Sequence, residues 1–149
     1  MRGTKTIHVK IPEGKMFLGA ALGLRLTHWE AVVQRLKEGL PIAAFERLSA
    51  SLDISTAKLA EVAGIAQRTL ARRKREGRLI LAESERVFRL AALFDKAKEV
   101  LGGTERARQW FKAPKQALHG KSPFECAETE IGAREVEDLL GRLEHGVFS

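Results

Sequence analysis

Residues 55–77, STAKLAEVAGIAQRTLARRKREG, decide how the rest of this chain is interpreted. The stretch predicts two short helices separated by a tight turn. Ser55 or Thr56 can cap the first helix, because a hydroxyl oxygen accepts a hydrogen bond from the free backbone N–H groups there. Gly64 permits a left-handed backbone conformation, which ends that helix and redirects the chain. We therefore expect a helical hairpin near the centre of the sequence.

The spacing of small and apolar residues within this hairpin is that of a helix-turn-helix. Ala60 lies five residues before Ile65, Gly64 lies at the turn, and Leu70 faces inward six residues after that glycine. This pattern sets the second helix in the major groove of DNA. Ordinary helical hairpins show the same offsets by chance, so spacing alone leaves both interpretations open.

The second helix of the hairpin is strongly basic. Opposed only by Glu76, six Lys and Arg residues lie close together: Arg68, Arg72, Arg73, Lys74, Arg75 and Arg78. A solvated helix face is the alternative interpretation of any such run of charge. However, the outward residues at the start of a recognition helix reach base edges, and Gln and Arg pair with adenine and guanine there.

The predicted DNA-binding residues are Gln67, Arg68 and Arg72, closest to bases, and Thr69 and Arg75, closest to phosphates. Arg73 departs from the generic helix-turn-helix, because another apolar residue usually occupies its place. It needs an explanation of its own.

The composition indicates an all-α protein whose length suffices for one or two small cores. The 149 residues include four Pro, no Tyr and a single cysteine, Cys126, which rules out an intrachain disulfide and fits a reducing cytoplasm. No apolar run approaches the roughly 20 residues that a membrane span requires. The four histidines have no ligand-like spacing, and no phosphate loop, nucleophile elbow or HExxH motif occurs. We therefore expect no membrane span, no metal, no cofactor and no catalysis.

Charge divides the chain into two parts. Residues 1–112 hold 22 Lys and Arg against 12 Asp and Glu, a net charge of +10, whereas residues 113–149 hold four against seven, a net charge of −3. A basic body with an acidic tail suggests two partners of opposite character, one of them a polyanion.

Hydrophobic periodicity predicts further elements on both sides of the hairpin. Residues 6–11 alternate as in a short strand, and a chain break is expected at residues 129–132. The expected helical segments cover residues 17–26, 29–36, 41–48, 84–101, 104–111 and a short turn from 123, with a last helix after the break. Segments 17–26 and 29–36 have no obvious core of their own, so we expect them to bury each other across a homodimer.

Three runs of the sequence resemble the Xre/MbcA/ParS-type antitoxins, the partners of RES-domain toxins. They are GLPIAAFERLSASLDIS, GIAQRTLARRKREGRLILAESERVFRLAALFDKA and WFKAPKQALHGKSPFECAETEIGAREVEDLLGRLEHGVF, and the resemblance covers about residues 39–148. It extends to the Arg72-Arg73 pair, which this family keeps where other repressors have an apolar residue.

The resemblance implies an antitoxin in three parts. Residues 1–38 would be an N-terminal helical segment involved in dimerisation, residues 39–112 a helix-turn-helix domain that binds operator DNA as a homodimer, and residues 113–149 a small helical toxin-binding domain. The partner would be a cognate RES-domain toxin that resembles ADP-ribosyltransferases and depletes NAD.

The predicted toxin-binding residues gather at the end of the chain, where the last helix has an apolar face and an acidic face. They are Leu140, Leu143, Glu144, His145, Gly146, Val147 and Phe148. Internal packing is the alternative for the apolar face, and at least two of Val136, Leu139, Leu140 and Leu143 should belong to the core.

Two other functions remain open from the residues themselves. One is a stand-alone helix-turn-helix transcriptional regulator that senses a small ligand, although no concave polar site is evident in residues 113–149. The other is a small enzyme or adaptor unrelated to DNA, which the arginine-rich second helix of the hairpin disfavours.

Overall fold

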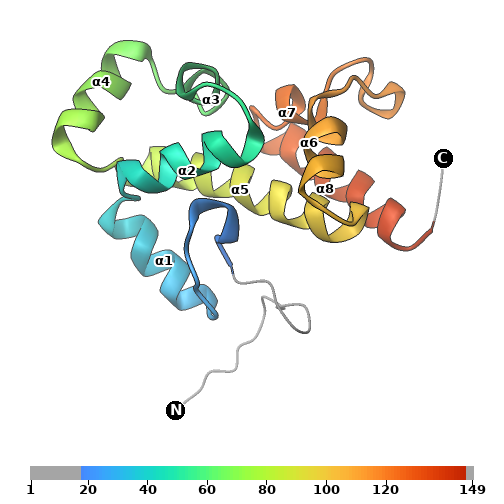
Figure 1. Ribbon diagram of the computed structural model, residues 1–149, viewed down its shortest axis with the longest axis horizontal. Coiled ribbons are helices and arrows are strands. Elements are labelled where there is room, and N and C mark those ends of the chain that lie inside the picture. The colour runs from blue at the N-terminus through green and yellow to red at the C-terminus, as the bar shows by residue number, and fades with distance from the viewer. Residues whose placement is uncertain (1–17, 147–149) are drawn as a thin grey trace.

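The computed structural model describes residues 18–146, and these residues form an all-α fold (Figure 1). The elements in chain order are η1 (Ala20–Leu22), α1 (Trp29–Glu38), α2 (Ile42–Leu52), α3 (Thr56–Val62), α4 (Gln67–Glu76), α5 (Leu81–Leu101), α6 (Thr104–Lys112), η2 (Gln116–Leu118), α7 (Pro123–Cys126) and α8 (Glu130–Glu144). The expected all-α class is confirmed, and no helix in the described part of the chain is long and apolar enough to cross a membrane.

Helices α3 and α4 form the hairpin expected from residues 55–77. The Ser55 hydroxyl oxygen accepts a hydrogen bond of 3.0 Å from the Lys58 backbone N–H, as a cap of α3 should. Gly64 adopts a φ of 72°, in the left-handed region that glycine occupies without strain. Ile65 is 3% exposed beneath the turn, so the predicted turn geometry is confirmed.

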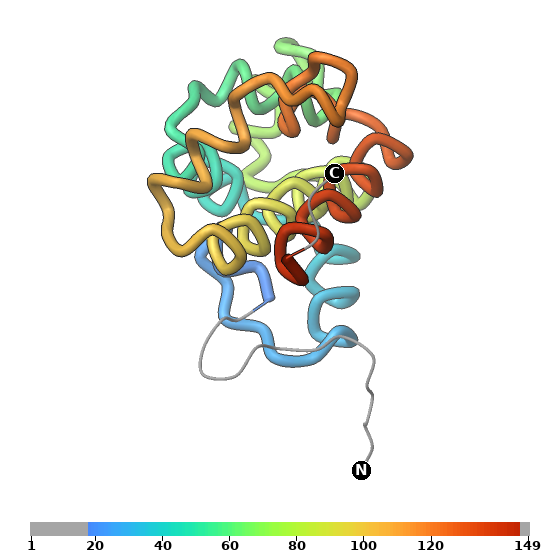
Figure 2. Tube along the Cα trace, turned by 90° about the vertical axis from the view of Figure 1, so that its right-hand side faces the viewer, coloured from blue at the N-terminus to red at the C-terminus, as the bar shows by residue number. Residues whose placement is uncertain are grey.

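Helix α5 is the axis of the molecule, with other helices packed along its whole length. It contacts η1, α1 and α2 on one part of its surface and α6 and α8 on another. Figure 2 shows α8 lying beside α5, whereas α1 lies below them. The predicted start of this helix at Ser84 is wrong, because α5 starts at Leu81. The Glu83 carboxylate accepts a hydrogen bond of 3.1 Å from the Ile80 backbone N–H, one of the groups left free at the start of a helix.

One continuous apolar core joins the two halves of the chain. Its buried residues run from η1 to α8, and the rings of Phe94 and Phe111 meet edge to face with centroids 5.8 Å apart. Phe111 also contacts Phe124, whose ring centroid lies at 5.9 Å. The C-terminal helices are therefore fastened to α5 by aromatic packing and not by a flexible linker.

The N-terminal segment packs differently from our expectation. The strand predicted at residues 6–11 lies outside the described residues, and residues 18–26 form a short loop, closed by a bridge between Leu18 and Leu26, in which only the 3-10 turn η1 is helical. Ala21 and Leu22 are each 2% exposed and belong to the core of their own chain. The premise that this segment has no core within its own chain is therefore wrong, because η1 packs on α2 and α5, whereas the homodimer itself stays a prediction.

The chain break expected at residues 129–132 lies slightly earlier, at residues 127–129, and α8 already begins at Glu130. Thr129 caps α8, its hydroxyl oxygen accepting from the Gly132 backbone N–H at 3.0 Å. Gly132 lies inside the helix, where a Cβ atom would overlap the backbone carbonyl oxygen of Cys126. A glycine that had indicated a break is thus a close contact between α7 and α8.

Candidate nucleic-acid interface and C-terminal surface

Helix α4 presents the residues predicted to bind DNA on its outer side. Gln67, Arg68, Arg72 and Arg75 are exposed, and Thr69 is half-buried. The structure thus places all five along one short helix, within reach of an external partner.

The contacts of these side chains leave positive charge available. Arg72 Nε lies 4.0 Å from the Glu76 carboxylate, but both side chains are about half exposed, so this pair holds the guanidinium weakly. Gln67 donates a hydrogen bond of 3.4 Å back to the Ala57 carbonyl oxygen. Arg68 makes no ion pair with any described residue.

Arg73 points to the interior and forms a two-pronged ion pair with Glu83. Its Nε lies 2.7 Å from Glu83 Oε1 and its Nη2 lies 2.8 Å from Glu83 Oε2. The two residues are only 7% and 5% exposed. Arg73 therefore replaces the apolar contact of a generic helix-turn-helix with a parallel pair of charged hydrogen bonds that connects α4 to the first turn of α5.

The protonation states of this pair are set by mutual contact. Hydrogen bonding to Glu83 raises the pKa of Arg73 further above its usual value, against the opposing effect of burial. Burial works to raise the pKa of Glu83, but the hydrogen bonds from Arg73 and from the Ile80 backbone outweigh it and hold that pKa below the usual value. Both groups are therefore charged at neutral pH.

The first turns of α5 also hold the neighbouring elements. The Ser84 hydroxyl oxygen accepts from the Leu40 backbone N–H at 2.9 Å, just before α2 begins. Arg86 Nε donates to the Ala63 carbonyl oxygen at 2.6 Å, at the turn between α3 and α4. The sequence analysis did not assign these roles to Glu83, Ser84 and Arg86, although a buried arginine in α4 required an acidic partner somewhere in the chain.

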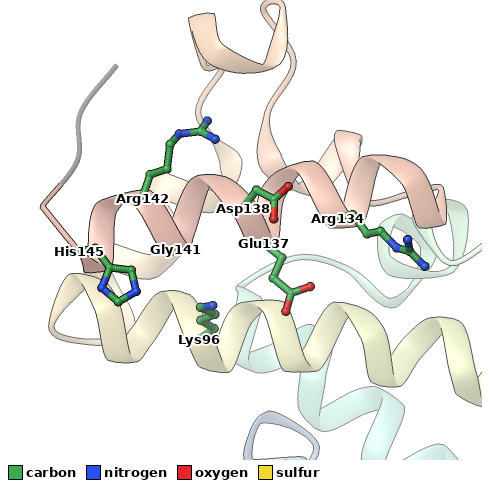
Figure 3. A pocket seen from close by; sticks show the side chains of 7 residues that line it. All are labelled: Lys96, Arg134, Glu137, Asp138, Gly141, Arg142 and His145. Carbon is green, nitrogen blue, oxygen red and sulfur yellow. The ribbon is translucent and has the colours of Figure 1, made fainter.

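At the other end of α5 an open groove of about 660 Å³ lies along α8 (Figure 3). Glu137 and His145 project from α8 towards α5, Lys96 projects from α5 towards them, and Arg142 extends to the other side of α8. The complete lining is Lys96, Arg134, Glu137, Asp138, Gly141, Arg142 and His145. Because both signs of charge are present, the groove suits a polar protein surface better than a single small ion.

The residues predicted to bind a toxin fall into three groups. Leu140 is fully buried, so its side chain is a core residue, and this corrects its assignment to a partner-facing surface. Leu143 is half-buried against the core, whereas Glu144, His145 and Gly146 are exposed. Val147 and Phe148 lie outside the described residues.

Metal-binding groups are absent from residues 18–146, since no three His, Cys, Asp or Glu side chains gather there in a way that could hold an ion. Cys126 is half-buried, and burial raises the pKa of its thiol. It is therefore a protonated thiol at neutral pH and not a reactive thiolate.

Comparison with known proteins assigns both halves of the structure. Residues 31–92 match the antitoxin Xre-like helix-turn-helix domain, and residues 96–146 match the antitoxin Xre/MbcA/ParS C-terminal toxin-binding domain. The first match contains the hairpin and its Arg73–Glu83 pair, and the second contains every residue that lines the groove along α8.

Similar whole proteins carry the same name. Antitoxin Xre of Yersinia enterocolitica is 37% identical over 130 residues, which cover 86% of this chain and 88% of the relative. Antitoxin Xre of Photorhabdus laumondii is 33% identical over 116 residues, which cover 76% of this chain and 78% of the relative. With a helix-turn-helix, a toxin-binding domain and relatives of nearly equal length, this chain belongs to the Xre/MbcA/ParS family of antitoxins.

Proposed function

We propose that this antitoxin has two activities. Through α4 it represses its own operon, and through its C-terminal part it neutralises an RES-domain toxin that degrades NAD. The observation that carries this proposal is the placement of the two candidate surfaces. Figure 1 shows α4 at one end of the molecule and the end of α8 at the other, with α5 between them. One chain can therefore hold DNA and a protein at the same time.

Repression rests on the exposed arginines of α4. Replacing Arg68 by Ala should cost about 1–3 kcal/mol of operator affinity and relax specificity at one base pair, because a guanidinium that pairs with guanine is lost. Gel-shift titration on the region upstream of the gene measures this effect. Arg134→Ala is the matched control, since it removes an exposed arginine on α8, far from α4. Unchanged operator affinity in Arg68→Ala would contradict the assignment.

A homodimer completes the repression proposal. A single recognition helix contacts few base pairs, and repressors of this kind double the contacts through two-fold symmetry. Trp29 and Val33, one helical turn apart on α1, are 40% and 38% exposed and offer apolar surface for such a contact.

Neutralisation rests on the acidic, exposed end of α8. A toxin that degrades NAD must bind a pyrophosphate, so its cleft should present positive charge, and the net charge of −3 in residues 113–149 complements it. Glu144, His145 and Gly146 are exposed beyond the core and are available to enter that cleft.

Truncation separates the two activities. A chain ending at Leu143 should still bind the operator but fail to protect cells that express the RES-type toxin from the neighbouring gene. The full chain is the positive control, and NAD content reports toxin activity directly. Full protection by the truncated chain would place the inhibitory surface earlier, and a full chain that binds no such toxin would favour a stand-alone regulator.

A further inference from the structure

No contact among the described residues explains why position 141 of α8 is a glycine. Gly141 lies inside a regular helix, four residues before the C-cap His145, and its φ is not in the left-handed region. A Cβ atom at this position would meet no atom within 4 Å. Glycine inside a helix is less stable than alanine, so the free protein loses stability here without any gain in packing.

The other glycine of α8 shows the contrast. Gly132 is required by the fold, because a Cβ atom there would overlap the Cys126 carbonyl oxygen where α7 and α8 meet. A close approach of backbone is thus the reason for one glycine of the helix. Among residues 18–146 no backbone approaches Gly141, so the same reason would apply to it if the approaching backbone belongs to a partner.

Arg142, the next residue, has a hydrogen-bond donor without an acceptor among the described residues. Its Nε atom is buried but finds no hydrogen-bond acceptor among the described residues. A buried donor without a partner is destabilising, and native structures leave few of them. Because this Nε atom is covered in the free chain, an oxygen atom of a partner reaches it only if the Arg142 side chain turns outward when the partner binds.

Both residues line the groove along α8, which is open to solvent beside Lys96 and His145, and the Arg142 guanidinium extends from this groove to the other side of the helix (Figure 3). Their position within residues 96–146 places them in the toxin-binding domain. Gly141 lowers the stability of α8 and the adjacent Arg142 leaves a donor unpaired, and a single feature would account for both. That feature is a partner chain lying directly against α8.

We propose that the backbone of the cognate toxin crosses α8 at Gly141 and supplies a carbonyl or carboxylate oxygen to Arg142. This rests on the proposed function, in that the toxin is the occupant of the C-terminal domain. It adds a docking surface on the body of α8 to the contacts of the chain terminus, and it assigns contact roles to two residues that the sequence analysis did not select.

Substitution of Gly141 by Ala and by Leu tests the proposal through two measurements with opposite expected signs. The melting temperature of the free antitoxin should rise or stay unchanged, because both side chains favour helix and enter open space. The Kd for the toxin, measured by biolayer interferometry with the purified product of the neighbouring gene, should increase at least about tenfold for Gly141→Leu and less for Gly141→Ala. A purely structural glycine would show lower stability and weaker binding together.

Two controls separate this surface from general effects. Ala50→Leu adds the same apolar side chain at an exposed position of α2, outside the toxin-binding domain, and should leave toxin affinity unchanged. Arg142→Met keeps the length of the side chain but removes its donors, so it should weaken toxin binding without lowering the melting temperature.

Three results would overturn the proposal or its basis. Gly141→Leu with the Kd of the wild type would show that no chain crosses α8 at this point. Gly141→Leu that changes the mass of the free antitoxin in light scattering, with toxin affinity intact, would assign the surface to a second copy. A wild-type antitoxin that fails to bind the toxin would instead refute the proposed function itself.

Discussion

Replacing Arg73 by Met should destabilise the protein strongly, although methionine is the kind of residue that other helix-turn-helix domains tolerate at this place. The substitution leaves the Glu83 carboxylate, 5% exposed in the wild type, with the Ile80 backbone N–H, at 3.1 Å, as its remaining hydrogen-bond donor among the described residues. Removing one member of a buried ion pair costs about 3–5 kcal/mol, because the remaining charge stays desolvated. The lost contact with Glu76 adds little, since the Glu76 side chain is 51% exposed.

The double variant Arg73→Met/Glu83→Gln makes this magnitude specific to the ion pair. The Gln side chain is neutral and its carbonyl oxygen can still accept from the Ile80 backbone N–H, so the cap of α5 is kept. We expect the double variant to recover at least about 1 kcal/mol relative to Arg73→Met. Urea denaturation followed by circular dichroism measures all three free energies of unfolding.

The pH dependence supplies an independent check. In the wild type the pKa of Glu83 is lowered, so its stabilising contribution is present at neutral pH and is lost as the pH falls through that pKa. In Arg73→Met the buried carboxyl keeps its desolvation but loses its hydrogen-bonded cation and retains only the weaker charge interaction with Arg86, so its pKa rises and protonation relieves the penalty. The deficit of the variant should therefore be largest near pH 7 and shrink towards about pH 4. A loss below about 1 kcal/mol at neutral pH, or a double variant less stable than the single one, would refute this account.

Three further predictions concern other parts of the fold. Burial raises the pKa of the Asp95 carboxyl in α5, so the free energy of unfolding of the wild type falls as the pH rises through that pKa. Asp95→Asn removes this titration, so its free energy of unfolding relative to the wild type should increase between about pH 4 and pH 7 in urea titrations. Gly132→Ala forces a Cβ atom against the Cys126 carbonyl oxygen and should lower the free energy of unfolding by about 1–3 kcal/mol. A melting temperature equal to that of the wild type would show instead that α7 shifts to make room for the Cβ atom. Val33→Glu places a charge on the exposed apolar face of α1 and should shift light-scattering mass from dimer to monomer, while an unchanged dimer would locate the contact elsewhere.

The hairpin was predictable because its signals are local. Ser55 caps the helix that follows it within one turn, and Gly64 adopts the left-handed conformation that its lack of a Cβ atom permits. The outward position of Arg68 and Arg72 follows from helical periodicity alone. The candidate DNA-binding surface could therefore be assigned from the sequence before any tertiary contact was known.

The features that escaped prediction depend on contacts between distant or differently oriented segments. Glu83 is ten residues from Arg73, beyond the end of α4, and no spacing rule pairs them. Gly132 resembles a helix breaker unless the position of Cys126 is known, and the burial of Leu22 depends on α2 and α5. Arg142 and Gly141 were missed for a related reason. They attract notice only because no described residue pairs with the Arg142 Nε atom or packs against the Gly141 position, and the sequence cannot show this.

The continuous core around α5 has a consequence for how this protein is removed. A chain whose two halves share Phe94 and Phe111 in one core is expected to unfold as one cooperative unit, so that loss of either half exposes the other to proteolysis. Degradation of the antitoxin therefore abolishes both binding surfaces in a single event. Under the proposed function, a cell that destroys this protein frees the toxin and reopens transcription of the operon at the same moment, so the replacement antitoxin begins to be made as soon as the old one is lost.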